Sequence, residues 1–220
     1  MIIQNINKAY KNKQILSEIS FEAPCGNCIG ILGCNGSGKS TLLNIMAGVL
    51  KPDSGKFVFD DKNLFEYPQI RSSVVGFVPQ NPPLFEELTA WDNLSLWYDK
   101  SVLKKELNSG VLKMLGIHEF LKTPVCKMSG GMKKRLAIGC SVSNNPKILL
   151  LDEPSSALDL ICKQNIVDYL KNFKAQGGII ILATHDLNEV EICDKLYILK
   201  DKKFTPYVYN GNPKELVQSL

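Results

Sequence analysis

The chain has 220 residues, of which 45% are hydrophobic and 22% charged, so it is long enough and apolar enough to build a substantial core. Its net charge, 26 − 22 = +4, is a mild excess that gives no special support to a nucleic-acid partner. The longest apolar runs, 148–151 and 179–183, are too short to span a bilayer, and no signal peptide is visible. Seven cysteines without an export signal therefore predict free thiols in a reducing cytosol.

Short strands and one glycine-rich loop dominate the first third of the chain. Apolar alternation or continuous apolar runs predict the strands, and glycine or proline marks where each element stops. In chain order we expect strands at 2–10, 15–22 and 28–33, a helix at 39–48, and strands at 56–60 and 73–79. The strand at 28–33 is continuously apolar and runs into the loop, so we expect it to be buried.

The middle of the chain, from about 84 to 145, has a different pattern. Leucine, lysine and tryptophan recur there at helical spacing, and no strand is predicted. Beyond it we expect strands at 147–154 and 177–186, helices at 159–175 and 187–193, a hairpin at 195–210 and a last short helix. Apolar strands that alternate with helices predict an α/β fold whose parallel sheet is covered on both faces, with the helical middle as a subdomain.

The loop GCNGSGKST follows the buried strand and opens a helix, which is the setting that the phosphate-binding motif G-x-x-x-x-G-K-[ST] requires. The backbone can aim successive N–H groups at phosphate oxygens because three positions of the loop are glycine, namely Gly33, Gly36 and Gly38. Lys39 would reach the terminal phosphates, and Ser40 would offer its hydroxyl to Mg²⁺. An ordinary glycine-rich turn would not need this strand–loop–helix order, so nucleotide binding is the favoured interpretation.

A pair of carboxylates ends a second apolar run, ILLLDEP at 148–154. Asp152 lies at the carboxyl end of this strand, where α/β sheets bind their ligands, and it is the expected partner of Mg²⁺. Glu153 beside it can act as the general base that polarises a water molecule. Alone the pair would fit a strand-end turn equally well, and the phosphate loop upstream favours the catalytic interpretation.

A second glycine pair stands before a helix in the stretch KMSGGMKKRLAIG, residues 127–139. Ser129 is a natural N-cap, and Gly130 and Gly131 leave N–H groups bare at the positive end of the helix, so the stretch predicts another phosphate site. Each cradle is complete by itself, so one nucleotide does not need both. We therefore expect the second cradle to reach the γ-phosphate held by another copy, in a head-to-tail dimer with two-fold symmetry.

These motifs, in this order, resemble those of the ATP-binding cassette (ABC) ATPases, the nucleotide-binding subunits of transporters, and the resemblance covers essentially the whole chain. It implies that GCNGSGKST is the Walker A loop, in which Asn35, Ser37 and Thr41 also bind the nucleotide. ILLLDEP matches the Walker B motif, MSGGM the LSGGQ signature and SALD (156–159) the D-loop.

Three further positions match the family's site residues. Tyr10 falls where an aromatic ring stacks on adenine, although an aromatic residue in a strand can also simply pack on its neighbours. Gln80 matches the Q-loop glutamine that meets Mg²⁺ and the attacking water, and His185 matches the switch histidine near the γ-phosphate. The catalytic set implied by the resemblance is therefore Glu153, His185 and Gln80, with Ser40, Gln80 and Asp152 around the metal.

The resemblance implies a P-loop NTPase parallel-sheet core with an antiparallel β subdomain and a helical subdomain at about 84–145, all in one ABC ATPase domain spanning 1–220. ATP and Mg²⁺ would close a head-to-tail dimer with a second copy or a paralogous subunit, and hydrolysis would reopen it. Separate transmembrane permease subunits would hold this cytoplasmic protein on the inner face of the cell membrane. The segment 81–91, next to Gln80, is the expected docking groove, although it also fits ordinary subdomain core.

Some residues depart from the family pattern or allow another function. Met128 replaces the usual signature leucine and Met132 the usual glutamine, while Cys34 is an uncommon occupant of the Walker A loop. The cations at 133–135 are predicted to be a solvated helix face, and the Cys-x-x-Cys at 25–28 to be structural. Two rival functions stay open: a non-transport ABC ATPase that acts as a clamp or signalling element in cell division or cofactor assembly, and a P-loop kinase, against which the signature argues.

Overall fold

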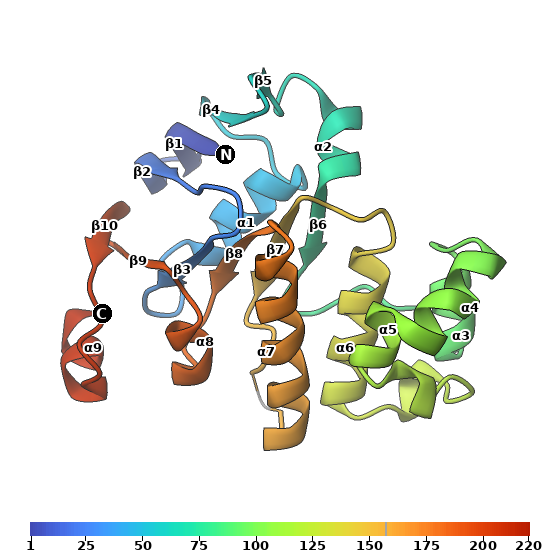
Figure 1. Ribbon diagram of the computed structural model, residues 1–220. Coiled ribbons are helices and arrows are strands. Elements are labelled where there is room, and N and C mark those ends of the chain that lie inside the picture. The colour runs from blue at the N-terminus through green and yellow to red at the C-terminus, as the bar shows by residue number, and fades with distance from the viewer. Residues whose placement is uncertain (157) are drawn as a thin grey trace.

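The computed structural model describes residues 1–156 and 158–220 and places a six-stranded sheet at the centre of the molecule (Figure 1). Neighbouring strands are parallel except at one edge, where the last strand returns antiparallel as a hairpin. In spatial order the strands are β10 (Lys203–Tyr207), β9 (Lys195–Lys200), β3 (Cys28–Leu32), β8 (Ile179–Ala183), β7 (Ile148–Asp152) and β6 (Val75–Val78). The strands β3, β7 and β8 are buried along their whole length, as their continuous apolar sequences predict.

A second, antiparallel sheet covers part of the first. Its strand order is β2 (Lys13–Glu22), β1 (Ile2–Tyr10), β4 (Ser54–Phe59) and β5 (Lys62–Asn63). An aromatic cluster joins the two sheets, because the ring of Phe21 lies 5.2 Å from Phe204 and 5.9 Å from Tyr197. The predicted antiparallel β subdomain is therefore present and packs on the hairpin edge of the central sheet.

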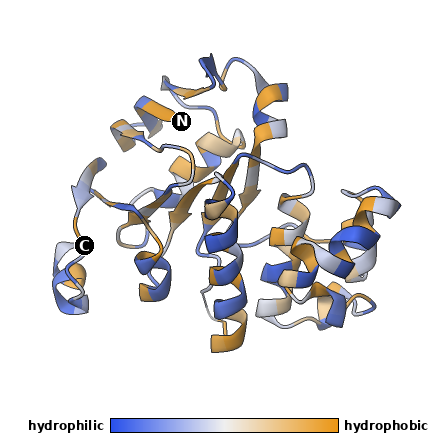
Figure 2. Ribbon diagram, viewed as in Figure 1, coloured by the Kyte–Doolittle hydropathy of each residue, from blue (hydrophilic) through white to orange (hydrophobic). Residues whose placement is uncertain are grey.

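Helices cover both faces of the central sheet, and Figure 2 shows hydrophobic residues gathered on its strands. On one face α1 (Lys39–Ala47) packs between the two sheets, in a cluster that includes Ile148 and Leu150. On the other face Leu149 and Leu151 belong to a cluster that includes α7 (Leu160–Ala175). Because successive residues of a strand point to opposite faces, the short strand β7 contributes side chains to both cores. The short helices α8 (Leu187–Glu191) and α9 (Pro213–Ser219) lie near the hairpin edge (Figure 1).

The stretch 84–145 is helical, as its periodicity predicts. It contains α3 (Ala90–Ser95), α4 (Lys100–Ser109), α5 (Val111–Met114) and α6 (Gly130–Ser141), with 3₁₀ turns at Ile117–Glu119 and Val125–Lys127. One isolated antiparallel bridge, between Thr89 and Pro124, interrupts the helical pattern. These helices share the hydrophobic cluster on the α7 face, so the helical stretch and the sheet have a common core.

Several predicted strands are shorter in the structure: those expected at 147–154 and 177–186 cover Ile148–Asp152 and Ile179–Ala183. The strand expected at 73–79 covers only Val75–Val78, because α2 (Pro68–Val74) occupies the residues before it. Pro68 stands at the first turn of this helix, where the fixed φ of proline is already helical and its missing N–H costs nothing. Within the described residues, no helix is both long and apolar enough to cross a membrane.

Candidate nucleotide site

The loop after β3 is shaped by contacts that only glycine and a buried lysine allow. A Cβ on Gly33, whose φ is +154°, would stand 2.5 Å from the Leu199 carbonyl oxygen and 2.7 Å from Ser37 Oγ. Lys39 is buried, and its Nζ donates to the carbonyls of Gly33 at 2.6 Å and Cys34 at 3.2 Å. The loop backbone therefore curves around the ammonium group of Lys39.

The start of α1 fits an anion. Gly38 is its N-cap residue, with φ +112°, and it has no side chain with which to cap the first turn of N–H groups. Space around Gly36 is open, and the buried Ser37 Oγ has no hydrogen-bond partner in the described part of the chain. Burial lowers the pKa of Lys39, while the Glu153 and Asp152 carboxylates act in the opposite direction. Bare N–H groups, a helix dipole and a buried ammonium group together suit phosphate.

A cavity of about 380 Å³ brings together most residues of the predicted nucleotide site. Those that line it are Tyr10, Asn35, Gly36, Gly38, Lys39, Ser40, Thr41, Gln80 and Glu153. Tyr10 is the last residue of β1 and is 46% exposed, and the Lys8 ammonium nitrogen lies over its ring, 5.6 Å from the centroid. Gly33 and Ser37 belong to the same loop but do not line the cavity.

The carboxylates Asp152 and Glu153 lie where β7 ends. Asp152 is only 3% exposed, and burial raises its pKa while Ser40, Lys134 and Lys39 act in the opposite direction. Glu153 has φ +50°, a left-handed conformation that is uncommon for a residue with a long side chain. Oxygen donors from Ser40, Gln80 and Asp152 fit Mg²⁺. This ion prefers few protein ligands and completes its shell with substrate phosphates and water.

Three side chains converge because their strands are neighbours. Gln80, Glu153 and His185 follow the carboxyl ends of β6, β7 and β8, which are adjacent and parallel in the sheet. Gln80 Nε2 donates to Glu153 Oε2 at 3.0 Å, and His185 Nε2 lies 3.5 Å from Glu153 Oε1. Burial and the nearby Lys39 lower the pKa of His185, against the pull of Glu153, so the imidazole is neutral near pH 7. One carboxylate oxygen of Glu153 thus accepts a hydrogen bond from Gln80, and the other lies close to the imidazole of His185.

The second cradle lies apart from this cavity. Ser129 is the N-cap of α6, and its side chain accepts a hydrogen bond from the Met132 N–H at 3.3 Å. Its two glycines have different surroundings: a Cβ on Gly130 would find only open space and Leu158 at 3.9 Å, whereas one on Gly131 would stand 2.7 Å from Cys162 Sγ. Gly131 is therefore required for the close packing of α6 on α7. None of the three cradle residues lines the cavity around Lys39.

The prediction for the cations at 133–135 is correct only for Lys133. That side chain is partly exposed and pairs with Glu86 at 2.9 Å, whereas Lys134 and Arg135 are 6% and 8% exposed. Arg135 donates to the Leu115 carbonyl at 3.1 Å and stacks over the Phe120 ring at 5.0 Å. Sequence reasoning missed this because α6 is packed on several sides, so its polar residues do not share one solvent-facing stripe.

The proposed D-loop falls partly on Ala157, which lies outside the described residues. Next to it, Ser156 is exposed and Asp159 is the N-cap of α7, accepting a hydrogen bond from the Cys162 N–H at 2.8 Å. Asp159 therefore caps the helix that follows the proposed D-loop.

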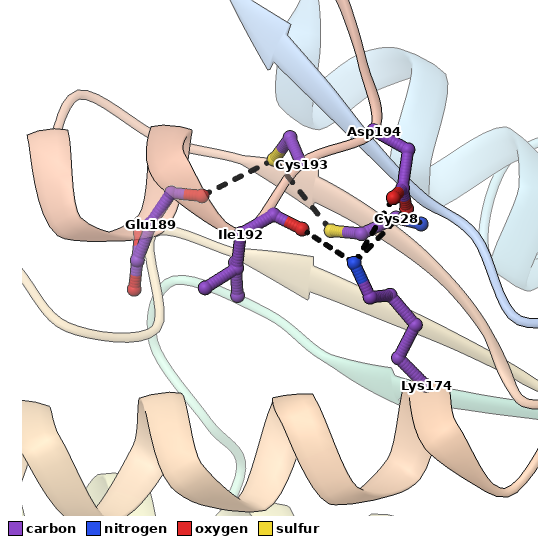
Figure 3. Close-up of polar contacts among 6 residues, drawn as sticks. All are labelled: Cys28, Lys174, Glu189, Ile192, Cys193 and Asp194. Atoms are coloured by element: carbon purple, nitrogen blue, oxygen red, sulfur yellow. Dashed lines mark hydrogen bonds and ion pairs between the residues drawn. The ribbon is translucent and has the colours of Figure 1, made fainter.

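The cysteines at 25–28 do not pair with each other. Cys25 is exposed, while Cys28 is buried at the start of β3 with its sulfur 3.5 Å from that of Cys193 (Figure 3). Asp194 accepts a hydrogen bond from the Cys28 N–H at 2.7 Å and contacts Lys174 at 3.1 Å. The Cys28 contact and burial raise the pKa of Cys193 well above its ordinary value, so the pair is a structural tie and not a reactive one. No group of three His, Cys, Asp or Glu side chains in the described residues is arranged to hold a metal ion.

Glu189, on α8, is a buried carboxyl group that sequence reasoning did not single out. It is 1% exposed, the Thr184 hydroxyl donates a hydrogen bond to one of its oxygens, and the other has no partner among the described residues. Burial raises its pKa. Because Thr184 precedes His185 directly, this carboxyl group holds the end of β8 from which the histidine extends.

We expect Glu189→Gln to become more stable relative to the wild type as the pH rises. The unfolded chain ionises Glu189 at its ordinary pKa, 4.5, whereas burial raises the folded value, so the wild type loses stability from that pH up to the folded pKa. The glutamine amide has no charge to bury. Urea unfolding followed by circular dichroism between about pH 4 and 8 measures the difference. Glu191→Gln, exposed on the same helix, is the control, and a difference that does not change with pH would contradict the assignment.

Comparison with known proteins agrees with this geometry. The family model described as "ABC transporter" matches residues 16–156, which is more than half of the chain. The chain is 34% identical over 212 residues to the lantibiotic transport ATP-binding protein SrtF of Streptococcus pyogenes, covering 96% of this chain and 91% of that protein. It is 32% identical over 222 residues to a probable sulfate/thiosulfate import ATP-binding protein, CysA, of Chlorella vulgaris, covering 98% and 92%.

Among solved structures, a dimeric ATP-binding cassette, MJ0796, in a post-hydrolysis state with ADP and Pi superimposes with a TM-score of 0.85. The sequences are 29% identical, and the match covers 96% of this chain and 99% of that one. The P-loop cavity, the carboxylate pair at the end of β7 and these matches lead to one conclusion. The chain belongs to the ABC transporter family, in which it is an ATP-binding cassette with an ATPase fold.

Proposed function

We propose that this chain hydrolyses MgATP to drive transport through separate transmembrane permease subunits. The convergence of Gln80 and His185 on the two oxygens of Glu153, at the wall of the P-loop cavity, supports this function best. A carboxylate that is oriented by an amide hydrogen bond, lies beside a neutral imidazole and faces a phosphate site is suited to activate a water molecule. Dissimilar cargo names among the relatives, a lantibiotic and sulfate, indicate that the cargo is chosen elsewhere in the assembly.

In this proposal the site residues share the steps of binding and hydrolysis. The loop N–H groups and Lys39 bind the β- and γ-phosphates, and Tyr10 stacks on the adenine at the cavity mouth. Glu153 accepts the proton of the attacking water, Gln80 orients that water, and His185 contacts the γ-phosphate. Bound Mg²⁺, held by Ser40, Gln80 and Asp152, would neutralise charge that develops on the phosphates.

A second copy, or a paralogous subunit, completes the site. Ser129, Gly130 and the first N–H groups of α6 would cover the partner's γ-phosphate, because within one chain they do not line the cavity that holds it. The dimeric cassette in a post-hydrolysis state, to which this chain is similar, supports the arrangement.

The permease is proposed to dock beside Gln80. A groove of about 500 Å³ is lined by Pro79 and Asn81, which flank Gln80, and by Phe85 and Trp97. Phe85 is 55% exposed and Trp97 58% exposed, which is unusual for large apolar side chains and typical of interaction surfaces. A segment seated there would touch both neighbours of a site residue, so docking and hydrolysis would be coupled. The chain would then lie on the inner face of the membrane, with no role for nucleic acid.

We expect the double variant Phe85→Ser, Trp97→Ser to lose membrane association and to keep its basal ATPase rate. Neither side chain lines the nucleotide cavity, so the rate of the isolated chain stays within about twofold, whereas the buried apolar contact with the permease is lost. The measurements are co-sedimentation with membranes that contain the permease and ATPase assays of the purified chain. Val208→Ser, at an apolar side chain 87% exposed, is the control. Undiminished co-sedimentation would refute docking at this groove.

A further inference from the structure

Lys134 carries a buried charge that the site residues described above do not account for. It lies in the second turn of α6 and is 6% exposed. Its Nζ donates to three backbone carbonyls, those of Gln80 at 2.8 Å, Pro79 at 3.2 Å and Asp152 at 3.4 Å. A lysine ammonium group has three N–H donors, so these contacts use all of them.

The three carbonyls need a donor because of where the sheet ends. The ladder between β6 and β7 stops at the pair Val78 and Leu151, and Pro79, Gln80 and Asp152 come directly after it. The bond to the Asp152 carbonyl is buried and those to Pro79 and Gln80 are partly buried, and carbonyls shielded from water are costly when unpaired. Lys134, which reaches across from the helical stretch, supplies the missing donors at the ends of two neighbouring strands.

The same carbonyls belong to residues that hold the reacting groups. The side chain of Gln80 donates to Glu153, and Asp152 precedes Glu153, whose φ of +50° depends on how the chain leaves β7. One ammonium group therefore fixes the backbone on both sides of the Gln80–Glu153 contact. It also places a positive charge close to Asp152 and Glu153.

We propose that Lys134 is a positioning residue, which ties α6 to the backbone of Gln80 and Asp152 and thereby sets the geometry of the Gln80–Glu153 pair in its own chain. This rests on the proposed ATPase function for its effect on turnover. Because α6 begins at Ser129 and Gly130, a shift of this helix on the partner's nucleotide would be transmitted through Lys134 to the water-activating residues of the same chain. The two nucleotide sites of a dimer would then be coupled within each subunit.

Lys133 offers a matched control. It is the preceding residue in the same helix, it carries the same charge, and its Nζ pairs with Glu86 at 2.9 Å on the surface. A general effect of removing a lysine from α6 should be the same at both positions. An effect of the three hydrogen bonds to backbone carbonyls should occur only at Lys134.

The experiment compares Lys134→Met with Lys133→Met. We expect Lys134→Met to lower kcat for ATP hydrolysis about tenfold and to leave the dissociation constant of the isolated chain for ATP within about twofold, because misplacement affects the reacting geometry more than phosphate binding. Lys133→Met should stay within about twofold of the wild type in both quantities. Hydrogen exchange of the nucleotide-free chain should show faster exchange in the segment 77–84 for Lys134→Met alone.

Two further variants separate positioning from simple loss of stability. Lys134→Gln keeps two N–H donors, so it should retain more of the wild-type kcat than Lys134→Met, and it replaces that variant if Lys134→Met does not fold. Leu136→Ala removes a fully buried side chain of the same helix and lowers the stability without touching the three carbonyls.

Several results would overturn the proposal. These are a kcat of Lys134→Met within about twofold of the wild type, an equal loss of kcat in Leu136→Ala at the same fraction folded, or unchanged exchange in 77–84. The exchange measurement uses no nucleotide, so it tests the anchor by itself. A wild-type chain that does not hydrolyse ATP would refute the proposed function, and a normal exchange pattern in Lys134→Met would refute the anchor.

Discussion

Glu153→Gln is expected to lower kcat for ATP hydrolysis by about 10²- to 10⁴-fold while ATP still binds, since a glutamine amide cannot accept the proton of the attacking water. The substitution keeps the shape of the side chain, and its amide oxygen can still accept the hydrogen bond from Gln80 Nε2, now 3.0 Å from Glu153 Oε2. The phosphate contacts of Lys39 and of the loop are untouched. The variant should therefore be trapped with its nucleotide uncleaved.

The trapped state can be measured as an oligomer. Size-exclusion chromatography with MgATP should show a Glu153→Gln dimer that is absent without nucleotide, because hydrolysis no longer reopens it. Glu191→Gln, an exposed carboxylate on α8, is the control and should turn over ATP like the wild type. A Glu153→Gln chain that stays monomeric at high concentration with MgATP would count against the head-to-tail dimer, and one that hydrolyses at the wild-type rate against Glu153 as the base.

Gly130→Glu is expected to abolish MgATP-dependent dimerisation and to lower hydrolysis about a hundredfold or more, because like charges brought together at an interface cost several kcal/mol. The new carboxylate would stand at the first residue of α6, where the partner's γ-phosphate is proposed to lie. The fold should tolerate the change: Gly130 is exposed, a Cβ there meets open space, and an acidic residue in the first turn favours the helix.

Three measurements define the outcome for this variant. Titration of the isolated chain with a fluorescent ATP analogue should give an affinity within about twofold of the wild type, since the P-loop cavity is unchanged. Chromatography of the double variant Gly130→Glu, Glu153→Gln with MgATP should show monomer only. Gly130→Ala, which adds a methyl group without charge, should still dimerise. If Gly130→Glu weakens ATP binding to the single chain, the second cradle serves its own nucleotide, and the two-copy arrangement is wrong.

The sequence by itself determined the parts of this protein that depend on neighbours along the chain. A glycine-rich loop between an apolar strand and a helix needs only local geometry to form a phosphate cradle, so GCNGSGKST could be interpreted without a structure. The same holds for the capping of α6 by Ser129 and for the alternation of apolar strands and helices that predicts an α/β core. Family membership followed from the order of several such local motifs.

The limits of local reasoning appear first at element boundaries. The strand expected at 73–79 was cut short by α2, because the choice between helix and strand for a short apolar run depends on packing. Likewise, Gly130 and Gly131 look equivalent in the sequence, and only the approach of Cys162 from α7 makes one of them sterically indispensable and leaves the other free.

Only the tertiary structure decided how distant residues meet. Gln80, Glu153 and His185 are neighbours because β6, β7 and β8 are adjacent in the sheet, and strand order is set by long-range pairing that no local pattern encodes. Long-range packing also determines which of the three consecutive cations at 133–135 is exposed and which are buried. Lys133 reaches solvent while Lys134 is buried at the ends of two strands, because the packing of α6 against the sheet determines which side of the helix meets unpaired carbonyls.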